Sequence, residues 1–146
     1  IKDPNFISES SRIFGSQCIV VSIDAKKVAN CKWEAYFDNG REPTGIDVIE
    51  WARKAESLGA GEIMLTSIDA EGTKKGFDID LNKSVSEAIS IPVISSGGAG
   101  NKSHISNLLN NSNVDAVALA SVLHYDLLNV GSIKQELVNN NIKVRI

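Results

Sequence analysis

The residues with the clearest capacity for chemistry form a glycine-rich segment, SGGAG at positions 96–100, between an apolar run and a helix that Asn101 is expected to open. Glycines let the backbone approach an anion closely, and the free N–H groups at a helix start favour negative charge. Ser96 and Gly98 are therefore predicted to bind phosphate, although glycine-rich turns also serve only to reverse the chain. The segment lacks both the GKS or GKT ending of a Walker loop and a GxGxxG spacing.

Two further segments could complete a phosphate site. Ala120 and Ser121 follow the next apolar run, and Gly72 lies in the turn EGT at positions 71–73. In barrels of parallel strands, loops after neighbouring strands meet at one face and commonly form a joint phosphate site. These residues are predicted to line one anion site with Gly98, while a plain turn is an equal alternative for the segment around Gly72.

Two aspartates are predicted at strand ends because a short motif repeats. The segment VSIDA at positions 21–25 recurs as TSIDA at positions 66–70, so that Asp24 and Asp69 each follow an apolar run. Partial desolvation at such a position raises a carboxyl pKa toward the range of a general acid or base. Lys26 and Lys27 would oppose that shift at Asp24, and an aspartate that caps a turn or pairs with a lysine is the alternative.

Composition and charge exclude several classes of function. The chain of 146 residues has a net charge of −3 and a pI near 5.4, which argues against a general nucleic-acid binder. Cys18 and Cys31 lack metal-ligand and disulfide spacing, and His104 and His124 have no ligand partners nearby, so neither a metal nor another cofactor is expected. No segment is typical of a signal peptide or a membrane span, which favours a cytoplasmic protein. The start at Ile1 instead of methionine indicates a missing N-terminal part.

Short apolar runs alternate with amphipathic stretches of helical length, the pattern of βα units in an α/β protein with a parallel sheet. Because the chain opens on a helix, four strand–helix units suit half of a (βα)8 barrel better than a doubly wound sheet. A hairpin is expected over the carboxyl ends of the strands, from residues 32–37 through an Asn-Gly turn at 39–40 to residues 41–44. Asp3 is expected to cap the first helix and Gly15 to end it. The predicted strands are residues 17–23, 62–67, 92–95 and 116–119, and the predicted helices are residues 4–14, 46–58, 81–89, 102–110 and 132–139.

Four segments together resemble the cyclase subunit of imidazole glycerol phosphate synthase: IVVSIDAKK, PTGIDVIEWARKAESLGAGEIMLTSIDAEGTKKGFD, PVISSGGAG and DAVALASV. The resemblance spans nearly the whole chain, and its motifs are highly specific. In that family these segments belong to strands five to eight. The resemblance therefore implies that residues 1–146 form a single (βα)4 half-barrel, the C-terminal half of a (βα)8 TIM barrel, preceded by helix four.

The resemblance also implies an activity. The family joins ammonia from a partner glutaminase to a phosphoribulosyl formimino aminoimidazole carboxamide ribotide, a phosphorylated small molecule, and no cofactor is involved. The products are imidazole glycerol phosphate and aminoimidazole carboxamide ribotide. The family's catalytic aspartate on strand five matches Asp24, whereas its partner aspartate on strand one lies outside this sequence.

Further residues take their expected roles from the same resemblance. Thr66 would line the substrate site on strand six, and Glu62 would belong to a gate for ammonia at the opposite end of the barrel. Glu71 stands where the family usually has aspartate, which leaves its side-chain role open. The family's phosphate site matches Gly72, Gly98, Ala120 and Ser121, with Ser96 close by.

Three alternatives stay open at this point. The related isomerase of the same pathway shares the half-barrel duplication and the phosphate loops, and a cyclase-like paralogue in surface-sugar synthesis uses the same ammonia chemistry. The run TSI at positions 66–68 and the AKK that follows Asp24 favour the cyclase.

The isolated half could also bind phosphate with little turnover, because strand one is missing. Two unpaired strand edges and an apolar inner face would then lead to self-association.

Overall fold

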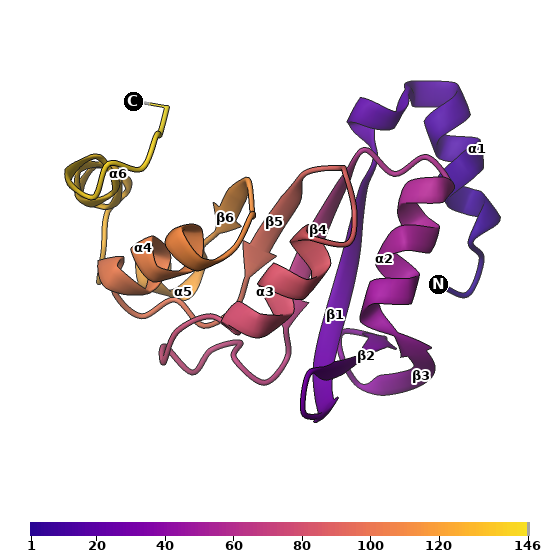
Figure 1. Ribbon diagram of the computed structural model, residues 1–146, viewed down its shortest axis with the longest axis horizontal. Coiled ribbons are helices and arrows are strands. Elements are labelled where there is room, and N and C mark those ends of the chain that lie inside the picture. Colours follow the sequence, from indigo (N-terminus) through magenta and orange to yellow (C-terminus); the bar gives the residue numbers. More distant parts are fainter. Residues whose placement is uncertain (146) are drawn as a thin grey trace.

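Four parallel strands form the centre of the molecule, which a computed structural model describes over residues 1–145. Consecutive parallel strands are connected through helices and lie next to one another in the sheet, so the predicted α/β arrangement of strand–helix units is confirmed (Figure 1). In sheet order the parallel strands are β1 (Val20–Ala29), β4 (Glu62–Ser67), β5 (Val93–Ser96) and β6 (Ala116–Ala118).

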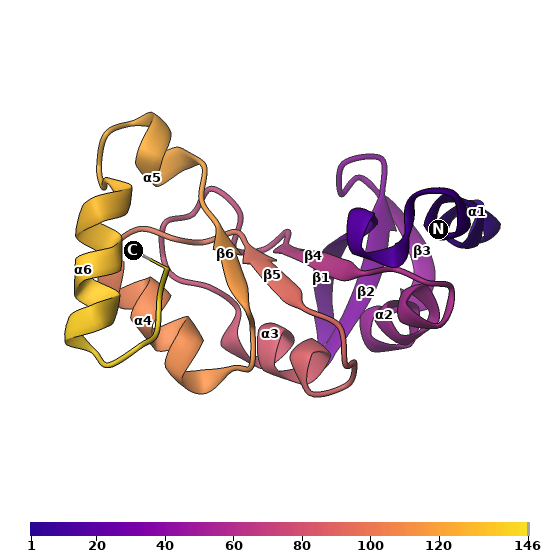
Figure 2. The same ribbon diagram turned by 90° about the horizontal axis from the view of Figure 1, so that it is seen from above.

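Helices cover one face of this sheet, where every second side chain of the strands is buried. Ile23, Leu65 and Ser95 are at most 2% exposed on this face. Helices α2, α3 and α4 run along it, while α1 and α6 lie at the two ends of the molecule (Figures 1 and 2). The helices are α1 (Asn5–Phe14), α2 (Val48–Ser57), α3 (Ile79–Ser86), α4 (Lys102–Asn111), α5 (Ser121–His124) and α6 (Val130–Asn139), with a short 3-10 helix η1 (Ser16–Cys18) before β1.

The opposite face of the parallel strands is only partly covered, and its side chains lie in rows across the sheet. The row nearest the carboxyl ends consists of Asp24, Thr66, Ser96 and Ala118, which are register partners on successive strands. At the amino ends, Val20 pairs with Glu62. The middle row consists of Ser22, Met64, Ile94 and Ala116. This inner face is therefore mixed in polarity and not apolar as predicted, because the strand ends supply polar side chains to a site.

The predicted antiparallel hairpin is present, and it extends the sheet beside β1, which was not predicted. It consists of β2 (Lys32–Phe37) and β3 (Glu42–Asp47), joined by a turn in which Asn39 and Gly40 have φ of +56° and +75°. The prediction that the first strand ends at Ile23 is wrong, because β1 continues to Ala29. From Asp24 onward β1 pairs with β2, and these added hydrogen bonds carry the strand beyond its parallel pairing with β4.

Most helix boundaries agree with the sequence predictions to within two or three residues. Gly15 ends α1 with a φ of +85° and an N–H that donates to Ser11 O, as expected for a glycine stop. Asn101 opens α4, and its side chain accepts the His104 N–H. Asp3 is not the side-chain cap of α1: the cap position is Pro4, and no side chain accepts a hydrogen bond there.

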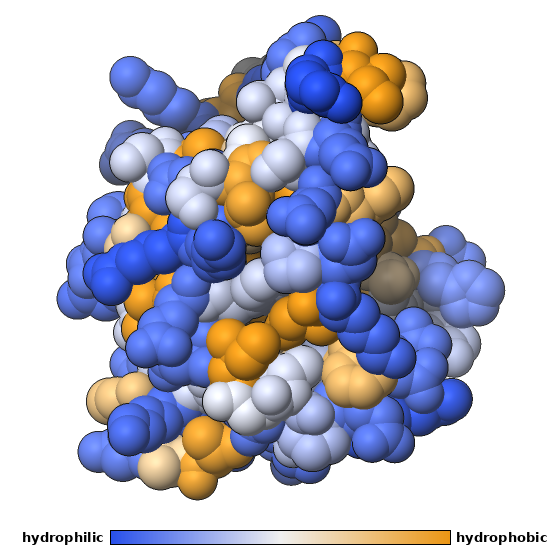
Figure 3. Space-filling view, turned by 90° about the vertical axis from the view of Figure 1, so that its right-hand side faces the viewer, coloured by the Kyte–Doolittle hydropathy of each residue, from blue (hydrophilic) through white to orange (hydrophobic). Residues whose placement is uncertain are grey.

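Apolar side chains reach the surface on the side of the molecule that carries α1 (Figure 3). Phe6, Ile13 and Phe14 are between 64% and 67% exposed, so α1 buries little of its apolar surface within this chain. Only Ile7 of this helix belongs to the core. Over residues 1–145, none of the helices combines the length and the apolar character that a membrane crossing needs.

Candidate functional site

Three loops meet at the carboxyl ends of β4, β5 and β6 and enclose a small cup. We call it the glycine cup; it is lined by residues 71–72, 96–99 and 118–122. The structure thus brings together all five residues that the sequence predicted for phosphate, although they come from three separate loops. These residues are Gly72, Ser96, Gly98, Ala120 and Ser121.

Close backbone contacts hold two of these loops together. The Gly76 N–H donates to Gly98 O at 2.8 Å. A Cβ on Gly98 would lie 2.1 Å from Gly76 O, and a Cβ on Gly100 would lie 2.0 Å from Lys74 O. Only glycine permits these approaches, which explains in physical terms why the segment is rich in glycine.

The glycine cup presents backbone N–H groups that have no acceptor within the part of the chain that the structure describes. Gly98 and Ala99 are buried, and neither N–H donates to an acceptor in residues 1–145. Ser121 and Val122 add the first N–H groups of α5, which no intrahelical carbonyl can satisfy. Buried N–H groups need a partner, and an anion between the loops would supply one.

Asp24 lies next to the glycine cup, in a separate open pocket. That pocket is lined by Asp24, Thr66 and Ile68, by the hairpin turn at Asn39 and Gly40, and by Glu71, which also lines the glycine cup. Burial raises the pKa of the Asp24 carboxyl above its ordinary value, because desolvation disfavours the charged form. Glu71 therefore lies between a half-buried carboxyl and the glycine cup.

The lysines near Asp24 do not pair with it. Lys26 Nζ lies 5.6 Å from the centre of the Tyr36 ring, and Lys27 Nζ lies 5.7 Å from the centre of the Trp33 ring. Neither forms a salt bridge with Asp24 in residues 1–145. The predicted alternative, an aspartate paired with a lysine, is therefore not what the structure shows.

The second aspartate of the repeated motif has a different environment. Asp69 lies in the turn that follows β4, and its Oδ2 accepts the backbone N–H of Lys27 at 2.8 Å. Asp69 thereby fixes the extension of β1 beyond the parallel sheet. The repeat predicted two similar positions, but Asp24 lines the open pocket at the strand ends whereas Asp69 bonds to the backbone of β1.

Glu62 lies far from these groups along the strand. It begins β4 at the amino end, is half-buried and pairs in register with Val20. The structure thus places Glu62 at the end of the sheet opposite the glycine cup, as the sequence predicted.

The sequence did not identify two contacts that hold the site in place. Trp33 is 1% exposed, and its Nε1 donates to Asp78 Oδ2 at 2.9 Å, which ties the hairpin to the start of α3. His104, considered from the sequence only as a metal ligand, accepts the Gly100 N–H at its Nδ1. No cluster of three potential metal ligands exists in residues 1–145. Trp33 and Asp78 are 45 positions apart, and a pair at this separation leaves no spacing signal in a single sequence.

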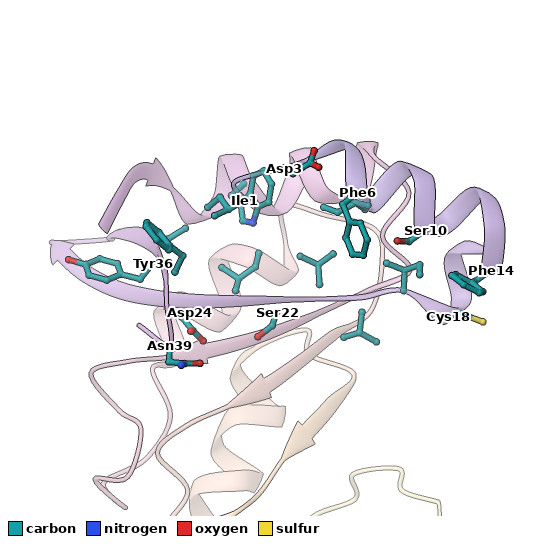
Figure 4. A pocket seen from close by; sticks show the side chains of 18 residues that line it. Ile1, Asp3, Phe6, Ser10, Phe14, Cys18, Ser22, Asp24, Tyr36 and Asn39 are labelled. Atoms are coloured by element: carbon teal, nitrogen blue, oxygen red, sulfur yellow. The ribbon is translucent and has the colours of Figure 1, made fainter. Parts of the chain in front are cut away.

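Grooves lie at both edges of the parallel sheet. One of about 660 Å³ separates α1 from β1, and Phe6 points from the helix toward the strand (Figure 4). Along this groove, residues 20–23 of β1 have a strand neighbour only on the β4 side. The other groove, of about 700 Å³, lies between β6 and α6. Within residues 1–145, the first part of β1 at residues 20–23 and the outer edge of β6 therefore have no strand neighbour on the groove side.

Residues 1–129 match the family model described as "Histidine biosynthesis protein". The chain belongs to this family. It is 49% identical over its 146 residues to "Imidazole glycerol phosphate synthase subunit HisF" of Bacillus cereus strain Q1, and 48% identical to the protein of that name from strain ATCC 10987 / NRS 248. In both comparisons the alignment covers all of this chain and 58% of the relative.

The chain thus spans somewhat more than half the length of these histidine biosynthesis relatives. Proteins of this family are TIM barrels, and the four parallel strands with their helices form the C-terminal half of such a barrel. The open grooves at both sheet edges are what a half-barrel leaves when it is not closed.

Proposed function

We propose that this chain is the phosphate-binding half of the cyclase of imidazole glycerol phosphate synthase. In the whole protein, the reaction joins ammonia to a phosphoribulosyl formimino aminoimidazole carboxamide ribotide and releases imidazole glycerol phosphate and aminoimidazole carboxamide ribotide. The observation that carries the proposal is the glycine cup beside Asp24, in a chain that is 49% identical to a protein of that name.

The glycine cup is the proposed site for a substrate phosphate. Backbone N–H groups of Gly72, Gly98 and Ser121 would donate to its oxygens, and Ser96 and Ala120 would line it. A site of N–H groups suits an anion without requiring a cation, which agrees with the net charge of −3. Thr66, in the row between Asp24 and Ser96, would contact the middle of the substrate.

Asp24 is the proposed general acid or base of this half. Its raised pKa follows from burial and moves the carboxyl toward the range in which it can both accept and return a proton. It would take a proton from the nitrogen that enters as ammonia during imine formation, and return one during ring closure. A second carboxyl from the first half of the barrel would complete the pair, so the isolated half is expected to bind phosphate with little turnover.

Ammonia would enter from the opposite end of the sheet, where Glu62 lies. The word "subunit" in the names of the relatives supports a second protein, which we propose to be a glutaminase that supplies ammonia. Glu62 would then belong to the gate at the interface. We further propose that residues 1–146 are one folding unit of a larger (βα)8 domain, and that this unit self-associates through its open edges when isolated.

Turnover with ammonium ions, with and without an added first half of the barrel, tests the proposal. The two halves together are expected to convert the substrate, and Asp24→Asn should lower kcat by about 10²- to 10⁴-fold. The control is phosphate affinity of the isolated chain, which Asp24→Asn should leave unchanged because the glycine cup is a separate pocket. Full activity of the chain alone, or turnover only of the related isomerase substrate, would refute the proposal.

A further inference from the structure

His104 lies behind the glycine cup, on the first turn of α4, and takes part in none of the steps proposed above. Three contacts surround it. The Gly100 N–H donates to its Nδ1 at 3.2 Å, its own N–H donates to Asn101 Oδ1 at 3.0 Å, and its Nε2 lies 3.2 Å from Asn101 Nδ2. The ring is thus held at the junction between the glycine segment and the helix.

These contacts indicate which ring nitrogen of His104 accepts a hydrogen bond. Asn101 Oδ1 already accepts from the His104 N–H and from the Ser103 hydroxyl, which fixes the orientation of the amide and turns its NH₂ group toward the ring. Both ring nitrogens therefore face donors, so the ring must be neutral to accept at all. A neutral imidazole accepts at one nitrogen only. The Gly100 N–H is fixed by the backbone and donates to Nδ1, so the lone pair lies on Nδ1, and Nε2 then forms no hydrogen bond with Asn101 Nδ2.

The same ring also faces the neighbouring loop. A Cβ added to Gly76 would lie 3.8 Å from the His104 ring, so the imidazole faces this loop across a space that one methyl group would fill. Gly76 in turn donates its N–H to Gly98 O. His104 thus faces the loop of Gly76, and it bonds to the residue directly after the free N–H groups of Gly98 and Ala99.

We propose that His104 is a positioning residue of the anion site. Its neutral Nδ1 accepts the Gly100 N–H, and this bond keeps the preceding N–H groups directed at the ligand. Without His104, the Gly100 N–H would lose the acceptor that the structure gives it, and the Ala99–Gly100 peptide would lose one of the contacts that orient it. The inference rests on the proposed phosphate site, because His104 would act only through the backbone of the glycine cup.

Sulfate binding to the isolated chain tests this role, since sulfate carries the same charge across the neutral pH range. His104→Ala should weaken sulfate binding by about five- to tenfold, the effect of losing one neutral hydrogen bond that orients the site. His104→Gln retains an acceptor at a similar reach and should keep the affinity within about twofold of the unsubstituted chain. Asn107→Ala, on the exposed side of the same helix, is the matched control and should change nothing.

Each result bears on a different claim. If the unsubstituted chain binds no sulfate, the glycine cup itself fails as an anion site, and the role of His104 fails with it. If the chain binds sulfate and His104→Ala binds it equally well, only the role of His104 is overturned. Nitrogen-15 NMR of the imidazole in the unsubstituted chain provides a test that does not depend on the folding of any variant. It should show an unprotonated Nδ1, and a protonated Nδ1 would overturn the proposal.

Discussion

The glycine cup and the pocket around Asp24 lie at the same end of the sheet, but this chain completes only one of them. Three consecutive loops of the chain enclose the glycine cup, and their backbones interlock at Gly76 and Gly98. Asp24 lies on β1, whose preceding residues 20–23 lack a strand neighbour on the groove side. On the proposed function, anion binding is expected to need only this half of the fold, whereas proton transfer is expected to need a further group from beyond the edge of β1.

The largest expected effect concerns the interlocked loops. Gly98→Ala would place a Cβ 2.1 Å from Gly76 O at a φ of +104°, so we expect a loss of about 3 kcal/mol in the free energy of unfolding and the loss of sulfate binding. Gly72→Ala is the matched control, because its φ is +72° and no atom lies within 4 Å of the added Cβ. It should cost about 1 kcal/mol. Equal losses in urea unfolding of the two variants would show that the loops are not interlocked.

Substitutions in the groove beside the open edge of β1 are expected to change self-association and to leave folding unchanged. Phe6 is 67% exposed and lines the groove, so Phe6→Glu should weaken self-association about 10- to 100-fold while leaving the unfolding transition in place. Ile13 is equally exposed on α1 but does not line the groove, and Ile13→Glu should have a much smaller effect. Sedimentation velocity over a micromolar concentration range measures both. A stable monomer without any substitution would contradict the expected association.

The hairpin connects the two regions, because Trp33 on β2 bonds to Asp78 at the start of α3. Asp78 uses its other carboxylate oxygen to cap the helix at the Leu81 N–H, 3.0 Å away. Trp33→Phe should therefore lower the free energy of unfolding by about 1.5 to 3 kcal/mol, as expected for a lost hydrogen bond to a charged group. Trp51→Phe is the control, since Trp51 is also buried but its ring donates no hydrogen bond within residues 1–145. Similar losses in both variants would mean that packing alone holds the hairpin.

The sequence predicted the regular elements and the lining of the glycine cup because both depend on local patterns. Alternating apolar runs identified the four parallel strands, and the Asn-Gly turn identified the hairpin. The extension of β1 past Asp24 could not be predicted, since it depends on pairing with β2 and on the Asp69 carboxylate 42 positions away from Lys27. The part played by His104 escaped detection for a different reason. Gly100 is only four positions away, but a histidine that accepts from a glycine N–H has no characteristic pattern, and only the loop conformation turns the two groups toward each other.

The smallest expected effect is on the free energy of unfolding, and it should differ between variants at Asp24 and at Asp69, the two aspartates of the repeated motif. Burial raises the pKa of Asp24, so the folded state holds its proton more tightly than the unfolded state does. This contribution to stability is fully present below the ordinary pKa of 3.8 and is lost as the pH rises through the folded-state value. Asp24→Asn should therefore be more stable than the unsubstituted chain at pH 7, by less than about 1 kcal/mol because water still screens the carboxylate. The difference should vanish near pH 3, as measured by urea unfolding.

Asp69→Ala should instead destabilise the chain at pH 7, because it removes the acceptor of the Lys27 N–H. A lower stability of Asp24→Asn at pH 7 would mean that the Asp24 carboxylate is held by favourable contacts, and that its pocket is as complete as the glycine cup.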